Sequence, residues 1–238
     1  TLVPTLVTTS PVCLGDPVTV SETAGNKGRY YYAITYSGTP DVTDGSVNDS
    51  TITLLYAAVG NYEVNFTMTD NVTGCVGRAT TTVTVNSLPV VSLSNKTICV
   101  GTDTKLTAVV SGGAASYSYL WPDGGTNVDT TVSPAATTSY TVSVTNANGC
   151  TNSASAMVTV NDTLVPVLTS NTPVCLGNDV VVNETAGNLS DYSYNISYMG
   201  NPVMTGGGMA DKTISLRYPA AGDYSVMFAV EDNLTHCV

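Results

Sequence analysis

Cysteine is the residue type in this chain with the most chemistry open to it. Thiols at regular positions either bind a metal or form disulfides, and the 238 residues contain six of them: Cys13, Cys75, Cys99, Cys150, Cys175 and Cys237. Zinc sites usually need closely spaced cysteine pairs or several histidines. No CxxC pair occurs and His236 is the only histidine. We therefore expect disulfides, which imply passage through an oxidising compartment and an extracellular location.

Carboxylates are the second group that could bind a ligand. Aspartates fall mostly in turns, where carboxylate and carbonyl oxygens can bind calcium, although no segment has EF-hand spacing. The calcium candidates are the aspartates that recur at equivalent places in the repeat described next, namely Asp49 with Asp211 and Asp70 with Asp232. The alternative is that all four are solvated turn residues. Apart from calcium, we expect no cofactor.

The chain repeats itself, and this decides what its cysteines and carboxylates are for. Residues 1–76 return without a gap as residues 163–238, with 40 of 76 positions identical, around a related middle unit. We therefore expect three domains, at residues 1–86, 87–161 and 162–238. Such arrays usually provide length and multivalency and not a catalytic pocket. His236 corresponds to Gly74 and no nucleophile elbow is present, so we predict that the chain is not an enzyme.

The repeat also selects one of the 15 possible cysteine pairings. Each unit has one cysteine before a glycine turn and another after a strand that begins at a tyrosine. One internal disulfide per domain follows from this arrangement. Each bridge would close a loop of about 51 to 62 residues and contribute about 4 kcal/mol. The predicted pairs are Cys13–Cys75, Cys99–Cys150 and Cys175–Cys237.

Composition excludes several classes of partner. Charged residues make up 11% of the chain, the net charge is −11, and Lys and Arg together number 7. Nucleic acid recognition needs a basic surface, so it is excluded, and anionic membrane surfaces are disfavoured for the same reason. No apolar run approaches the 18 residues that a membrane span needs. We expect no membrane insertion.

Alternating apolar and polar residues predict β-strands throughout, including residues 18–24, 30–36, 51–57, 62–68 and 80–86. The two copies show which face is buried, because Ile52, Leu54 and Tyr56 stay apolar as Ile214, Leu216 and Tyr218. About seven short strands per unit predict an all-β chain of three β-sandwiches. Short joints that contain proline predict semi-rigid linkers and a rod.

The third unit stops soon after Cys237, whereas the first unit continues after Cys75 with VGRATTTVTVN. We expect the last strand of the third domain to be missing from this chain. An unpaired edge is a liability. Either a continuing polypeptide or a strand from another molecule would complete it.

Several segments carry a family resemblance. They are Gly101 with Leu106, residues 119–121 (YLW), residues 137–150 (TTSYTVSVTNANGC) and residues 158–160 (VTV), with residues 60–75 and 222–237 in the outer units. These resemble the PKD-like and Ig-like repeats of giant surface adhesins that gliding bacteria secrete through the type IX system. The resemblance covers nearly the whole chain. It implies export, surface display and a stalk or adhesive role.

The sandwich fold and the resemblance also assign roles to single residues. Trp121 is expected to pack against the disulfide, and corner tyrosines to tie down turns at Tyr62, Tyr140 and Tyr224. The pattern of Asp followed by Ser or Thr looks like the O-glycosylation signal of the same bacteria, which implies sugars on Ser50, Thr130 and Thr163. Sequons recur at the same place in both copies as Asn71 and Asn233, which are the N-glycosylation candidates.

Our main expectation is a structural stalk that extends and displays, with neighbouring repeats of the same or an identical chain as partners. One alternative is a module that binds a surface polysaccharide or a protein through the loops at residues 26–29, 37–49 and 200–211. The other is a filament subunit that assembles by strand donation at the open edge of the last domain.

Overall fold

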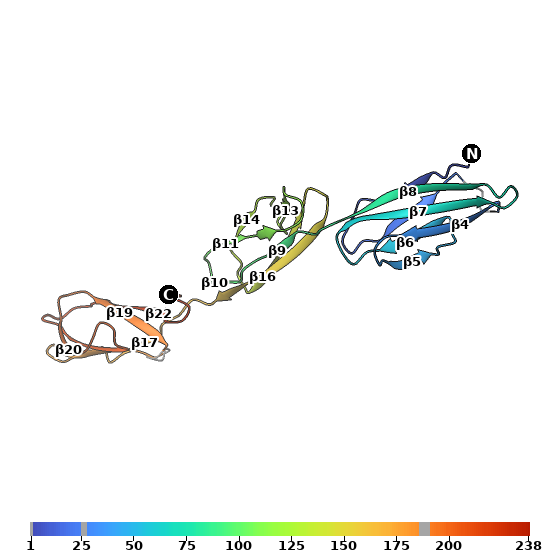
Figure 1. Cartoon of the computed structure of the whole chain (residues 1–238). Coiled ribbons are helices and arrows are strands. Elements are labelled where there is room, and N and C mark those ends of the chain that lie inside the picture. The colour runs from blue at the N-terminus through green and yellow to red at the C-terminus, as the bar shows by residue number, and fades with distance from the viewer. Residues whose placement is uncertain (1, 25–27, 186–190) are drawn as a thin grey trace. The chain divides into compact units, whose positions relative to one another are not determined.

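The computed structural model describes residues 2–24, 28–185 and 191–238, and every regular element in these residues is a β-strand (Figure 1). No helix in the described part of the chain is long and apolar enough to cross a membrane. The chain forms two compact units that are discontinuous in sequence. Unit 1 contains Thr1–Leu93, Thr107–Thr130 and Thr141–Ser155, and unit 2 contains Ser94–Leu106, Thr131–Tyr140 and Ala156–Val238.

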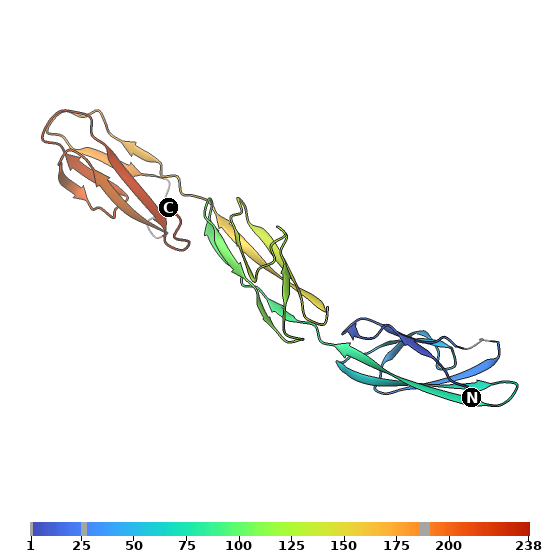
Figure 2. The same ribbon diagram turned by 90° about the horizontal axis from the view of Figure 1, so that it is seen from above.

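Unit 1 contains a first sandwich built from two four-stranded sheets, which appear as two layers in Figure 2. One sheet has the order β1-β3-β6-β5, with bounds Leu6–Thr8, Val18–Glu22, Thr51–Leu55 and Asp41–Gly45. The other has the order β2-β8-β7-β4, with bounds Val12–Cys13, Val76–Asn86, Gly60–Asp70 and Tyr30–Tyr36. The pairing is antiparallel except between β2 and β8, which run parallel.

The core of the first sandwich lies where strand alternation predicts it. Side chains on successive strand positions point to opposite faces, so every second residue of β3 and β6 turns inward. Val18, Val20, Ile52 and Leu54 are fully buried and pack with Phe66 of β7. The prediction that Ile52, Leu54 and Tyr56 form a buried face is confirmed.

The middle of the sequence contributes strands to both units. In unit 1, β9 (Val90–Ser92) pairs with β12 (Val109–Ser111), and β13 (Ser118–Leu120) pairs with the end of β15 (Thr138–Thr145). In unit 2, β10 (Lys96–Cys99) runs parallel to the end of β16 (Thr151–Asn161). The strands β11 (Thr104–Thr107) and β14 (Asp129–Val132) form a separate two-stranded sheet.

Unit 2 contains a third sandwich that copies the first. One sheet has the order β17-β18-β21-β20, with bounds Leu168–Ser170, Val180–Glu184, Thr213–Arg217 and Val203–Gly207. The other sheet pairs β19 (Tyr192–Tyr198) with β22 (Val226–Asp232). Among the described residues, no strand pairs with β22 on the side where β8 pairs with β7 in the first sandwich. The chain is therefore all-β with repeated Ig-like sandwiches, as predicted.

Two tyrosines stabilise turns by hydrogen bonds from their hydroxyls, as the sequence predicts. The Tyr62 hydroxyl donates to the Ala58 carbonyl oxygen at 2.9 Å, and the Tyr224 hydroxyl donates to that of Ala220 at 3.1 Å. Each ring also stacks on a core tyrosine, with centroids 3.9 and 4.0 Å apart. Tyr140 makes no such bond in the described structure, so its predicted role as a corner tyrosine is wrong.

Replacing either corner tyrosine by phenylalanine should lower the free energy of unfolding by about 0.5–1.5 kcal/mol, the usual net contribution of one hydrogen bond. The ring stack is retained in Tyr62→Phe and Tyr224→Phe, so only the hydroxyl bond is lost. Urea denaturation measures the change. Tyr31→Phe is the control, because Tyr31 is 70% exposed. Equal stability of Tyr62→Phe and Tyr31→Phe would contradict the assignment.

Candidate functional site

Each disulfide joins segments that the sequence assigned to different domains, which contradicts the predicted pairing. Cys13 bonds to Cys150 and Cys99 bonds to Cys237, each with 5.5 Å between the Cα atoms. Cys75 and Cys175 are free and exposed. The pairs Cys13–Cys75, Cys99–Cys150 and Cys175–Cys237 are therefore wrong, as is the prediction of one internal disulfide per domain.

Strand length explains why the internal pairs cannot form. Cys13 lies opposite Asn86 at one end of β8, whereas Cys75 directly precedes the other end, where Val76 pairs with Thr69. The strand has 11 residues, so at about 3.3 Å per residue its ends lie roughly 33 Å apart. A disulfide needs Cα atoms within about 7 Å. The same geometry separates Cys99, opposite Asn161, from Cys150, which precedes the 11-residue β16.

We call Cys13, Cys99 and Cys175 the leading cysteines of the first sandwich, the middle segment (residues 87–161, called the middle sandwich below) and the third sandwich. Their trailing cysteines are Cys75, Cys150 and Cys237. A leading cysteine lies beside the end of the last strand of its sandwich, as the registers of Cys13 with Asn86 and Cys99 with Asn161 show. A trailing cysteine lies in the turn before that strand. Each observed disulfide joins the leading cysteine of one sandwich to the trailing cysteine of the next.

Polar contacts in unit 1 hold the trailing turn of the middle sandwich against the chain that leaves the first. The Nδ2 atom of Asn146 donates to the Ser87 carbonyl oxygen at 2.9 Å, and that of Asn152 donates to the Pro89 carbonyl oxygen at 2.9 Å. These two asparagines flank Cys150, which is fully buried. The contacts bring Cys150 to the end of β8, where Cys13 lies.

An aspartate caps the trailing turn in both outer sandwiches. Asp70 Oδ1 accepts hydrogen bonds from the backbone N–H groups of Thr73 and Val72 at 3.0 and 2.8 Å, and the Arg29 guanidinium bonds to Oδ2. These bonds, first the one from Thr73, lower the pKa of Asp70 to about 2. The backbone N–H groups of Thr235 and Leu234 make the same bonds to Asp232 and lower its pKa.

The capping bond predicts how stability depends on acid. An ordinary aspartate has a pKa of 3.8, whereas in the fold the pKa of Asp70 is about 2. The contribution of its ionised carboxylate to stability is therefore complete above pH 3.8 and is lost as the pH falls towards 2. Asp70→Asn should therefore lose less stability between pH 5 and pH 2.5 than the natural chain. Urea midpoints at the two pH values test this, with the exposed Asp49→Asn as control. An unchanged pH slope in Asp70→Asn would contradict it.

The calcium candidates are not brought together. Asp49 and Asp211 are exposed, and each donates its backbone N–H within its own turn, to Ser46 and Gly208 respectively. Asp70 and Asp232 cap the trailing turns. Among the described residues, no group of three or more His, Cys, Asp or Glu side chains is placed to bind a metal ion.

The glycosylation candidates differ in exposure. Ser50 is only 6% exposed, so the folded sandwich does not present its hydroxyl for modification. Thr130 is half-buried and donates to Asp123 Oδ2 at 3.2 Å, while Thr163 is exposed. Asn71 and Asn233 are exposed in the trailing turns. Modification of the last four residues stays a prediction.

Trp121 lies in the interior, and two of the three candidate binding loops contain edge strands. Trp121 is 2% exposed and its Nε1 donates to the Asn127 carbonyl oxygen at 2.9 Å, so the indole belongs to the interior. Of the three predicted binding loops, residues 37–49 contain β5 and residues 200–211 contain β20, which are edge strands of their sheets. In the loop at residues 26–29, Asn26 and Lys27 lie outside the described residues.

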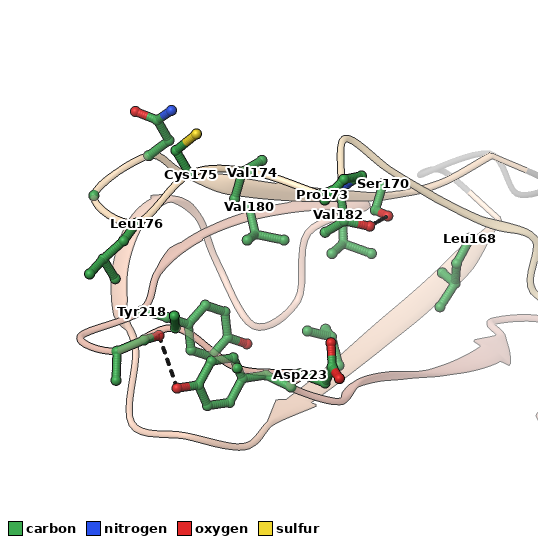
Figure 3. A pocket seen from close by; sticks show the side chains of 18 of the residues that line it. Leu168, Ser170, Pro173, Val174, Cys175, Leu176, Val180, Val182, Tyr218 and Asp223 are labelled. Atoms are coloured by element: carbon green, nitrogen blue, oxygen red, sulfur yellow. Dashed lines mark hydrogen bonds between the residues drawn. The ribbon is translucent and has the colours of Figure 1, made fainter.

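A cavity of about 620 Å³ opens into the third sandwich. In the first sandwich, β8 covers the equivalent side of the core. Val180 and Val182 point into the cavity above the Tyr218 ring, and Cys175 lies on its rim with the sulfur directed away (Figure 3). In the first sandwich the equivalent Val18 and Val20 pack in one core with Val83 and Val85 of β8. Leu14 also packs on that core, whereas its counterpart Leu176 is 64% exposed.

Sequence reasoning missed two buried glutamates. Glu22 is 6% and Glu184 is 1% exposed. Glu22 Oε1 accepts from the Thr5 backbone N–H at 3.1 Å, and Glu184 Oε1 accepts from that of Val167 at 3.2 Å. Each carboxylate therefore fixes the chain segment that enters its sandwich. The signal was present in the sequence, because a glutamate recurs in both copies on the apolar face of a strand.

No family model and no curated protein matches this chain. Several solved structures are similar to this chain at low sequence identity. Three N-terminal domains of the Highly Immunogenic Outer Capsid protein of bacteriophage RB49 give 18% identity and a TM-score of 0.40, covering 98% of this chain and 92% of that one. The titin I-band fragment I67-I69 gives 16% and 0.38, covering 96% and 94%. The Clostridium thermocellum CbhA fibronectin(III)-like modules give 18% and 0.36, covering 66% and 95%. These scores are too low to indicate a function.

Proposed function

We propose that the chain is a structural segment of a secreted surface protein, which spaces and displays other domains and has no catalytic role. The observation that carries this proposal is the pair of long-range disulfides, Cys13–Cys150 and Cys99–Cys237, each of which links segments of two predicted domains. A bond inside a domain stabilises only that domain. A bond between consecutive domains also resists their separation under load, which a spacer requires.

The cellular setting follows from the same bonds. Structural disulfides persist in oxidising compartments outside the cytosol, and a surface with few cations and a net charge of −11 suits an extracellular chain. The resemblance to repeats of type IX-secreted adhesins of gliding bacteria supports a place in a long surface adhesin. Sugars on Thr130, Thr163, Asn71 and Asn233 would protect such a segment from proteases.

Labelling of intact cells tests the proposed location. An antibody raised against this chain should label unbroken cells that make the natural protein, and proteinase added outside should remove the signal. A cytosolic protein probed on the same cells is the control, since it should be labelled only after lysis. Labelling of this chain that also requires lysis would refute surface display.

Filament assembly is a second candidate, favoured by the cavity in the third sandwich. The valines that line it, Val180 and Val182, and the side of β22 that no described strand pairs with would suit an added strand with alternating valines. Sedimentation of the reduced chain at increasing concentration tests this function, because strand donation needs no disulfide. We expect concentration-dependent assembly that a peptide of residues 76–86 inhibits. A chain that stays monomeric at all concentrations would refute filament assembly.

A further inference from the structure

The two free cysteines are of opposite kinds. Cys175 is a leading cysteine and Cys75 is a trailing cysteine. The other leading cysteines, Cys13 and Cys99, each bond to the trailing cysteine of the following sandwich. We propose that Cys175 and Cys75 are the two halves of the same interdomain disulfide, each completed by a neighbouring domain of this repeat. The inference rests on the proposed structural function and names its partner.

The equivalents of both free cysteines are bonded in this same structure. By the internal repeat, Cys175 corresponds to Cys13, which bonds to Cys150 in unit 1, and Cys75 corresponds to Cys237, which bonds to Cys99 in unit 2. Each kind of position therefore already forms the proposed bond once within the chain.

The leading position is shaped alike in its bonded and free forms. The carbonyl oxygen of Cys13 accepts from Asp16 at 2.9 Å, and that of Cys175 accepts from Asn178 at 3.0 Å. A glycine with positive φ closes each turn, at +96° for Gly15 and +93° for Gly177. Cys175 is thus presented on the same turn as its bonded equivalent, and its thiol is exposed.

The trailing position is also shaped alike in both forms. The backbone N–H of Asp70 donates to the Cys75 carbonyl oxygen at 2.9 Å, and that of Asp232 donates to Cys237 at 3.0 Å. Each aspartate caps its turn with Oδ1. The difference lies in exposure, since Cys237 is 1% exposed and Cys75 is exposed. Cys75 therefore lacks only the neighbour that covers Cys237.

The cavity in the third sandwich independently indicates what accompanies the partner of Cys175. In the first and middle sandwiches the leading cysteine lies beside the end of the last strand, at Asn86 and Asn161. The cavity with Cys175 on its rim occupies the corresponding place. A strand in this cavity would end beside Cys175 and lead into the next domain, whose trailing turn would carry the bonding cysteine. That domain belongs either to the same polypeptide or to a second copy of this chain.

Formation of the bond requires a disulfide as oxidant, either a small-molecule disulfide or a disulfide-exchange protein. The Cys75 thiolate attacks one sulfur of oxidised glutathione and releases one glutathione thiolate. The thiolate of the partner's leading cysteine then attacks the Cys75 sulfur and releases the second. Two protein thiols become one disulfide, and one oxidised glutathione becomes two reduced molecules.

The first arm of the test asks whether a second copy can supply the partner. Cys75→Ser and Cys175→Ser are prepared separately, one labelled with ¹⁵N, and are oxidised with glutathione alone and as a mixture. The mixture should form heterodimers linked through Cys175 and Cys75. The ratio of heterodimers to each homodimer should be about tenfold above the statistical value of two, because a weak docking contact favours the proposed pair by that factor. Cys75→Ser/Cys175→Ser is the control and should stay monomeric.

The second arm asks whether a following domain of the same polypeptide supplies the partner. Val238 is extended with a copy of residues 77–161, which adds an equivalent of β8 and of the middle segment, residues 87–161. Peptide mapping without reduction should find Cys175 bonded to the copied Cys150. Success in either arm supports the inference and identifies the source. Statistical or homodimer-dominated products in the first arm, together with a free Cys175 in the second, would overturn it, and the surface-labelling result would be unaffected.

Discussion

Pulled from its two ends, the oxidised chain should extend to about 350 Å, and the reduced chain to about 830 Å. The reason is the sequence separation of 137 residues that the Cys13–Cys150 bond spans. About 100 of the 238 residues then remain in the covalent path between the ends. The Cys99–Cys237 bond overlaps this loop and supplies a second path of similar length.

Single-molecule force spectroscopy measures this contour length before and after reduction. Cys13→Ser/Cys99→Ser under oxidising conditions is the matched control and should extend like the reduced chain. The three internal pairs predicted from the sequence would leave about 60 residues in the path, or roughly 220 Å. A contour length near that value would contradict the interdomain bonds.

The third sandwich should become more stable by a large margin when a strand equivalent to the end of β8 is added. Appending a copy of residues 77–86 after Val238 places equivalents of Val83 and Val85 over the cavity beside Tyr218. A fully buried valine contributes about 1.5–3 kcal/mol, so two valines contribute about 3–6 kcal/mol and the Tm of this sandwich should rise by at least roughly 12 °C. Differential scanning calorimetry follows the transition.

The control for the added strand carries threonine in place of both valines. Threonine keeps the tendency to form a strand and the backbone hydrogen bonds, but it does not fill an apolar cavity. We expect the control to give less than half the rise in Tm. An equal rise in the control, or no rise with valine, would show that the cavity is not the place of the last strand.

The fold could be predicted from the sequence to a large extent, because alternation and the internal repeat are both local signals. Ile52 and Leu54 alternate with polar residues and stay apolar in the second copy, and both are fully buried. The predicted strands at residues 30–36 and 51–57 appear as β4 and β6. Strand ends differ by a few residues, as in the 11-residue β7.

The disulfide pairing could not be predicted in the same way, because it depends on long-range register. Placing Cys13 beside Asn86 requires the parallel pairing of β2 with β8, which joins segments about 70 residues apart and leaves no local pattern. The contacts of Asn146 and Asn152 with the interdomain chain are equally non-local. The sequence predicted this strand only over residues 80–86, whereas the 11-residue β8 separates Cys75 from Asn86.

Peptide mapping after trypsin digestion without reduction tests the interdomain bonds most directly. Cleavage at the few lysines and arginines places Cys13 on residues 1–27, Cys75 on 30–78, Cys99 on 97–105, Cys150 with Cys175 on 106–212, and Cys237 on 218–238. The account predicts that 1–27 is linked to 106–212 and that 97–105 is linked to 218–238, with Cys75 in neither of these two bonds. A link between 1–27 and 30–78 would contradict it.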